Sequence, residues 1–205
     1  MQNDQSHAGP RHGAKAIAII IAVALLASMA ACSTKKSESQ LAADALAAGL
    51  TAQKAGDMAT AAADYRQVLV HDPKNQFAYY NLGLIDQTNN SMASADSNYS
   101  LALSIDPNFE SALYNLAIVK TAESDSTSAI QLYQQVIKLD PKNAAAHLNL
   151  GFALINDGQK GPGKGELAKA VSLDPTLASR IPSDPGQPSS GPSAQPGSPQ
   201  SSASP

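Results

Sequence analysis

The chain has 205 residues, of which 15% are charged and 4% are aromatic, and its formal net charge at pH 7 is -3. This length predicts one domain with appended segments. This mild acidity argues against a nucleic-acid partner, which would need a clustered basic surface. The single cysteine excludes an internal disulfide framework and a cysteine-rich zinc site.

Residues 1–31 are expected to form a signal peptide or a membrane anchor. The first fifteen are polar and carry Arg11 and Lys15, whereas residues 16–31, AIAIIIAVALLASMAA, contain no charge. As a helix these sixteen residues extend for about 24 Å, slightly less than the roughly 30 Å of a hydrocarbon core. The layout predicts export of the chain that follows, and a spanning helix remains an alternative.

The apolar run ends at MAAC, with two small residues directly before Cys32. This ending resembles a bacterial lipobox, and the resemblance implies cleavage before Cys32 and a lipid on its sulfur. The alternative is an uncleaved transmembrane anchor over residues 16–31, with Cys32 buried and inert. Both alternatives predict a membrane-anchored protein of the cell envelope, with a linker over residues 32–40 and the remaining chain on the extracytoplasmic side.

The middle of the chain repeats in a fixed 34-residue register. Asp-Pro pairs stand at 72–73, 106–107, 140–141 and 174–175. A small residue keeps the same register at Gly49, Gly83, Ala117 and Gly151, and a large one at Tyr65, Tyr99, Tyr133 and Leu167. Such a period predicts helix-turn-helix units. Proline ends one helix before the next begins, because it lacks the donor N–H and its ring disfavours helix at the preceding residue.

These motifs resemble the tetratricopeptide repeat, in which a large residue stands three positions before Leu-Gly. Here the pattern reads Tyr79…Leu82-Gly83 and His147…Leu150-Gly151. The resemblance implies an all-α fold, a right-handed superhelix of four stacked helix-turn-helix repeats over residues 42–175. The four repeats are expected at 42–75, 76–109, 110–143 and 144–177, and His147 is expected to be a packing residue.

Eight helices are expected, at 41–54, 57–70, 76–89, 92–104, 110–122, 126–138, 144–156 and 164–172. The last one is predicted to begin late or to fray, because GQKGPGKGE (158–166) contains four glycines and one proline. Only TLASRI (176–181) is available to cap the final repeat. Its end is therefore either a contact surface or a frayed terminus.

Residues 182–205 are expected to form a disordered tail. Pro, Ser and Gly occupy 18 of these 24 positions, and Asp184 carries the only charge. A segment of this composition cannot bury enough apolar area to fold.

The sequence shows no nucleophile paired with a base, no phosphate-binding loop and no cluster with metal-ligand spacing. GPGKG (161–165) lacks the Lys-Ser/Thr pair of a phosphate loop and is interpreted as a turn. We therefore expect no enzyme activity, no cofactor, no metal and no small-molecule substrate.

The first helix of each stacked repeat is expected to line a concave groove that binds a protein or an extended peptide. The predicted groove residues are Phe77, Tyr80, Asn81, Leu84, Tyr114, Asn115, Ile118, Leu148, Asn149 and Phe152. The three asparagines occupy one register position in successive repeats, and side-chain amides both donate to and accept from a peptide backbone. The alternative is that these amides only make local hydrogen bonds.

Together these observations favour a membrane-tethered scaffold or adaptor that mediates protein–protein or protein–peptide interaction in the bacterial cell envelope. One alternative is a structural assembly factor that oligomerises, or docks on an envelope machine, through its C-terminal repeat. Another is a non-catalytic accessory subunit of an envelope enzyme.

Overall fold

The computed structural model describes residues 36–182. The chain separates into two units, Met1–Ser37 and Glu38–Pro205, and the second is described here by itself. The signal or anchor, Cys32 and the segment after residue 182 lie outside the described residues. Within residues 36–182, no helix combines the length and the apolar character that crossing a membrane requires.

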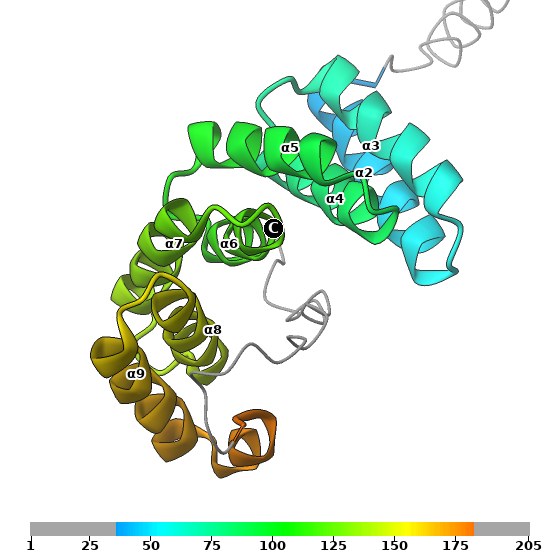
Figure 1. The fold of residues 1–205 in the computed structure, drawn as a ribbon. Helices are drawn as coiled ribbons and strands as arrows, with labels where there is room; N and C mark the ends of the chain where they lie inside the picture. Colours follow the sequence, from blue (N-terminus) through cyan, green and yellow to red (C-terminus); the bar gives the residue numbers. More distant parts are fainter. Residues whose placement is uncertain (1–35, 183–205) are drawn as a thin grey trace, which may run out of the picture. The chain divides into compact units, whose positions relative to one another are not determined.

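The described residues are all-α, with eight α-helices followed by one 3-10 helix. The bounds are α2 Glu38–Lys54, α3 Met58–His71, α4 Gln76–Thr88, α5 Met92–Ile105, α6 Glu110–Ala122, α7 Ser126–Leu139, α8 Ala144–Asn156, α9 Lys160–Leu173 and η1 Pro175–Arg180. Each helix packs against the next one in the chain, and Figure 1 shows the resulting row. The prediction of an all-α helical repeat is confirmed.

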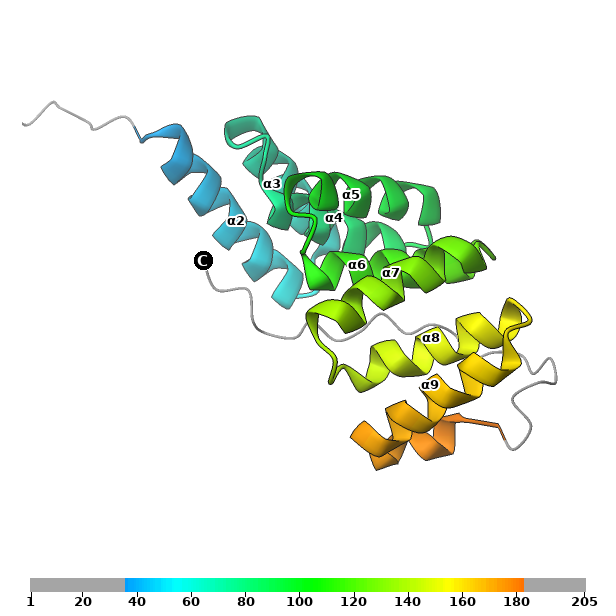
Figure 2. The same cartoon turned by 90° about the vertical axis from the view of Figure 1, so that its left-hand side faces the viewer.

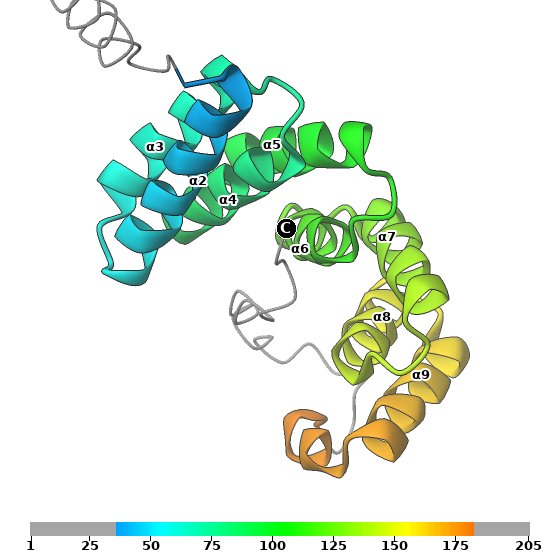
Figure 3. The same ribbon diagram turned by 180° about the vertical axis from the view of Figure 1, so that it is seen from behind.

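The helices of this unit form two layers. Helices α4, α6 and α8 lie along one side of the row, and α5, α7 and α9 lie along the other (Figures 1 and 3). The row bends toward α4, α6 and α8. We call the side that these three helices line the inner face.

Each Asp-Pro pair ends a helix in the same way. The backbone N–H of Asp72 donates to the Val68 carbonyl at 2.7 Å and closes α3. Its side chain then accepts from the N–H of Lys74, two residues further on, at 3.2 Å. Equivalent side-chain bonds of 3.0, 2.9 and 3.0 Å form at Asp106, Asp140 and Asp174. Aspartate thus supplies the turn and proline prevents the helix from continuing.

The small residue and the tyrosine of the 34-residue register meet where the two helices of a repeat cross. A Cβ atom added to Gly83 would lie 2.6 Å from Cε1 of Tyr99, and one added to Gly49 would lie 2.7 Å from Cε1 of Tyr65. The two tyrosines are fully buried. A side chain at either position would displace the tyrosine ring, because the ring fills the space that a Cβ would take.

The prediction that the last α-helix begins late is wrong, because α9 begins at Lys160. Pro162 lies in the first helical turn, where an N–H has no acceptor within the helix, so proline is tolerated there. Gly163 is buried, and a Cβ on it would lie 2.6 Å from Cγ1 of Ile155 in α8. Glycine therefore lets α9 cross α8 closely.

The final repeat is also covered at its end. Helix η1 follows α9 directly, and Figure 2 shows it, in orange, beside α9. Leu177 of η1 is buried in one cluster with Leu148 of α8, and Ile181 packs against that cluster. The TLASRI segment thus buries apolar surface of α8 that a further repeat would otherwise cover.

Replacing Gly83 with alanine should destabilise the fold by about 1–3 kcal/mol, because the added methyl group overpacks against the Tyr99 ring. The matched control is Gly165→Ala in α9, where the added Cβ would meet nothing within 4 Å apart from its chain neighbours and the backbone of its own helix. This control should stabilise the chain by up to roughly 1 kcal/mol through helix propensity. Urea unfolding followed by circular dichroism measures both changes, and equal effects would contradict the packing argument.

Candidate functional site

The three predicted groove asparagines donate to oxygen atoms of the chain itself. Asn115 Nδ2 donates to the Tyr80 hydroxyl at 3.1 Å, and Asn149 Nδ2 donates to the Tyr114 hydroxyl at 2.9 Å. Each of these bonds joins the first helices of two neighbouring repeats. We call this contact the Tyr–Asn joint.

The structure corrects the prediction of an open row of amides. Asn81 and Asn115 are buried, and only Asn149 is half-buried. Asn81 Nδ2 donates to the Phe77 carbonyl within its own helix, at 2.8 Å. Each amide nitrogen already donates one hydrogen bond within the chain, so a peptide on the inner face would have to compete with these bonds. The alternative of local hydrogen bonds therefore describes Asn81, whereas Asn115 and Asn149 bond to the preceding repeat, which the sequence did not predict.

The tyrosine position changes to leucine in the first and last repeats. Leu46, Tyr80, Tyr114 and Leu148 occupy the same register position in the four repeats. Leu46 has no hydroxyl to offer Asn81, which is consistent with the turn of that amide toward Phe77. Leu148 is fully buried with Leu177, so its predicted exposure in the groove is wrong.

The tyrosines of the joint also contact the buried tyrosines of the second helices. The ring centroids of Tyr80 and Tyr99 are 5.9 Å apart, as are those of Tyr114 and Tyr133. The Tyr99 hydroxyl donates to Gln87 Oε1 at 2.8 Å. Burial raises the pKa of Tyr80, and the hydrogen bonds of its hydroxyl with Ser111 and Asn115 partly offset this rise.

Three half-buried aromatic rings meet at the junction of the second and third repeats. The centroid of Phe109 lies 5.6 Å from that of Phe77 and 5.0 Å from that of Tyr80. Each residue keeps part of its surface accessible. We call Phe77, Tyr80 and Phe109 the aromatic patch. Its rings offer apolar, polarisable contact surface to a partner.

Phe109 stands where the register places a helix-capping asparagine. Asn75 and Asn143 hold this register position in the neighbouring repeats, and they accept from backbone N–H groups of α4 and α8 at 3.0 and 2.9 Å. Phe109 precedes α6 and makes no side-chain cap bond. Losing such a cap typically costs about 1 kcal/mol. Sequence reasoning missed Phe109, although the Asn-Phe-Asn series in the register was the signal that could have revealed it.

The other predicted groove residues are less accessible or are used in packing. Ile118 is buried, at 4% exposure, which corrects its placement in an open groove. Leu84 is half-buried against the cluster around Tyr99, and Phe152 against the cluster around Leu148. Of the ten predicted residues, Phe77, Tyr80 and Tyr114 remain as half-buried aromatic side chains outside the terminal cluster.

His147 is a packing residue, as predicted. It is buried, with Nδ1 2.6 Å from Oε2 of Glu166 and Nε2 3.1 Å from the Pro141 carbonyl oxygen. These contacts join α8 to α9 and to the turn before α8. Within residues 36–182, no three His, Cys, Asp or Glu side chains form a group that could hold a metal ion.

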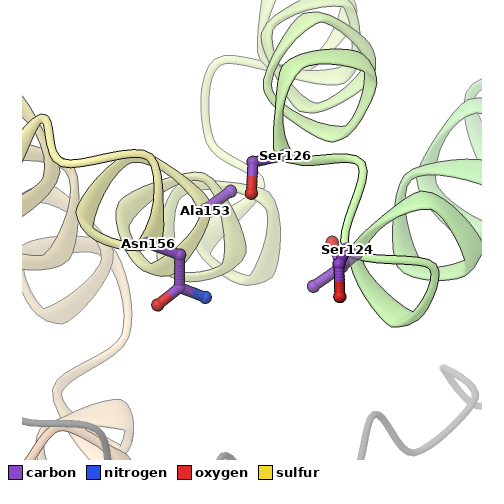
Figure 4. Close-up of a pocket in the computed structure, with 5 residues that line it drawn as sticks. Ser124, Ser126, Ala153 and Asn156 are labelled. Carbon is purple, nitrogen blue, oxygen red and sulfur yellow. The ribbon is translucent and has the colours of Figure 1, made fainter.

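A polar hollow of about 420 Å³ lies between the third and fourth repeats. Figure 4 shows Ser124, from the turn between α6 and α7, and Ser126, the first residue of α7, with Ala153 and Asn156 of α8 beside them. Thr121 completes the lining. None of these side chains is charged. The hollow therefore offers hydrogen bonds rather than acid–base groups.

Comparison with known proteins identifies the repeats. A tetratricopeptide repeat model matches residues 46–107, and a TPR repeat model matches residues 120–158. These segments are therefore tetratricopeptide repeats, as the 34-residue register predicted. Tetratricopeptide repeats mediate interactions between proteins. No curated protein matches the chain.

Several solved structures are similar to the chain in fold. MamA of Desulfovibrio magneticus RS-1 is 22% identical to this chain, with a TM-score of 0.62. The matched region covers 65% of this chain and 76% of the MamA chain. YrrB is 21% identical, with a TM-score of 0.60, and the matched region covers 64% of this chain and 68% of the YrrB chain. PilF of Pseudomonas aeruginosa is 22% identical, with a TM-score of 0.61, and the matched region covers 69% of this chain and 65% of the PilF chain. These identities support a shared fold.

The buried tyrosines should make the fold sensitive to high pH. Burial, assisted by the charge of Asp64, raises the pKa of Tyr65 to about 12, and burial also raises the pKa values of Tyr99 and Tyr133. The unfolded chain then releases protons near pH 10 that the folded chain retains. Stability present below pH 10 should be lost as the pH rises toward 12, by about 1.4 kcal/mol per pH unit for each such tyrosine.

Urea unfolding at pH 9, 10.5 and 11.5 measures this loss. The variant Tyr65→Phe should lose stability less steeply than the unmodified chain, since one buried phenol is absent. Equal slopes for the two chains would contradict the assignment to Tyr65.

Proposed function

We propose that this chain is a non-catalytic scaffold that binds a protein or an extended peptide on the inner face of α4 and α6. The observation that carries the proposal is the aromatic patch, in which Phe109 replaces a helix cap and joins Phe77 and Tyr80. A residue that breaks a local folding rule without a compensating cap is expected at a functional surface. Aromatic side chains are also the residues that most often dominate binding energy at interfaces.

The chemistry of the inner face suits a largely uncharged partner segment. Besides the patch, the half-buried Leu84, Ser111 and Tyr114 stand at inner-face positions of α4 and α6, and none of them is charged. The fold comparison supports a peptide ligand, because YrrB is described as a tetratricopeptide repeat protein with an unusual peptide-binding site. The specific contacts proposed here are the ring faces, since each asparagine nitrogen already donates a hydrogen bond within the chain, for Asn115 and Asn149 in the Tyr–Asn joints.

We further propose that residues 1–32 tether the repeats to a membrane in the bacterial cell envelope, on the extracytoplasmic side. The uncharged run at 16–31 and the position of Cys32 after two alanines support this location. Intact-mass analysis of the protein purified from membranes tests it. A mass lacking residues 1–31 and carrying a lipid on Cys32 is expected for the lipoprotein form.

Assembly through the C-terminal repeat receives no support from the contacts. Leu177 and Ile181 already pack on the apolar surface of α8 at that end. The proposal therefore places the partner on α4 and α6.

The variant Phe109→Asn should separate binding from folding. It restores the register's capping residue, which is worth about 1 kcal/mol, and it removes one half-buried ring, which is worth a similar amount. The midpoint temperature of thermal unfolding should therefore change little. Loss of an interface aromatic residue should lower partner recovery at least about tenfold.

The measurement is affinity capture from an envelope extract with the full-length, detergent-solubilised chain as bait, quantified by mass spectrometry. Val70→Ser is the matched control, since Val70 is 68% exposed on α3, outside the inner face. A protein recovered equally by all three baits is not a partner of the patch. If no captured protein depends on Phe109, the proposal fails.

A further inference from the structure

We propose that the chain's own C-terminal tail binds the aromatic patch, through the prolines Pro196 and Pro199. The inference relies on the proposed function only for the external partner that would displace the tail. The binding of the tail itself follows from where the described chain ends, from the chemistry of the tail, and from the distance that it has to cover.

The described chain ends on the same side of the row as the patch. Leu177 and Ile181 pack with Leu148, which occupies in α8 the register position of Tyr80 and Tyr114. Burial raises the pKa of the Tyr114 phenol, and the positive charge of Arg180 in η1 partly offsets this rise. The described chain therefore ends, after η1, on the inner face.

The tail has the composition of a ligand for aromatic surfaces. Residues 183–205 include six prolines, and their only charge is on Asp184. Two Pro-x-x-Pro segments occur, PGQP at 185–188 and PGSP at 196–199. Polyproline II has three residues per turn, so prolines three apart lie on one side. Such segments dock on aromatic-lined surfaces, and their preformed conformation lowers the entropic cost of binding.

The charge of the tail also matches that of the surface. The patch consists of Phe77, Tyr80 and Phe109, none of which is ionised at neutral pH. An uncharged segment therefore loses no ionic hydration when it lies on these rings. A strongly charged ligand would lack a countercharge in the patch.

The distance favours the distal proline pair. From η1 to the patch the tail would pass over α8 and α6 and end between α6 and α4. At about 10 Å per helix, this path is roughly 25 Å long. Pro188 is six residues beyond Pro182 and reaches about 19 Å in polyproline II, whereas Pro196 reaches about 43 Å. Leu148, Phe77 and Tyr80 all lie in the first halves of their helices, so little additional distance along the helix axes is needed.

Tail binding would regulate the proposed scaffold. A partner of the inner face would have to displace the tail from the same rings. The effective concentration of a tethered segment is in the millimolar range for short linkers, so even a weak contact competes measurably.

Photo-crosslinking of the full-length chain in detergent tests the inference. Benzoylphenylalanine is incorporated in place of Phe77, and cross-linked peptides are identified by mass spectrometry after irradiation. We expect cross-links to residues 183–205 in a product of monomer mass. Incorporation at Val70 on α3 is the positional control and should give no cross-link to the tail.

Two matched proline variants test the assignment within the tail. Replacing Pro196 and Pro199 with serine should reduce the cross-link at least about fivefold. Replacing Pro185 and Pro188 with serine should leave it unchanged. Neither proline pair lies within the described helices, so both variants should fold like the unmodified chain. Circular dichroism checks that their helical content is unchanged.

Three outcomes would overturn the inference. They are the absence of cross-links to the tail, cross-links found only in products of dimer mass, and cross-links that persist after Pro196 and Pro199 are replaced. The second outcome would assign the patch to the tail of another copy. Because no external partner is present in this experiment, each of these outcomes leaves the proposed function to be decided by the capture measurement.

Discussion

The hydrogen bond from the Asn115 amide to the Tyr80 hydroxyl determines how the inner face is built. It joins two neighbouring repeats, and it uses for this purpose the polar group that sequence spacing assigned to a ligand. The same contact recurs one repeat later, from Asn149 to Tyr114. A buried amide N–H is costly to leave unpaired, so each tyrosine hydroxyl that accepts one helps to fix the position of the next first helix.

This constraint explains which surface remains for binding. The tyrosine hydroxyls are occupied by the joints, while the rings of Tyr80 and Tyr114 stay half-buried on the inner face. In the first and last repeats leucine takes the tyrosine position, and at the C-terminal end Leu177 and Ile181 pack in the cluster of that leucine. We therefore propose the surface where Phe109 adds a third ring to Phe77 and Tyr80 as the binding surface.

The 34-residue register was sufficient to predict the repeats, because Asp-Pro, the small residue and the tyrosine each perform a local task. The start of α9 was mispredicted, since propensity ignores the close approach that Gly163 allows against Ile155. The asparagines were assigned to a groove because spacing gives the face of a helix but not its hydrogen-bond partners. The acceptors for Asn115 and Asn149 lie 35 residues away, which only the packed structure reveals.

The most direct test of this account is a double-mutant cycle between Tyr80 and Asn115, with Tyr80→Phe, Asn115→Ala and the combined variant compared by urea unfolding. A buried hydrogen bond between repeats predicts a coupling energy of about 1 kcal/mol. Additive effects, with Asn115→Ala as stable as the unmodified chain, would contradict the account. The amide would then be free to bind a peptide, as the sequence alone predicted.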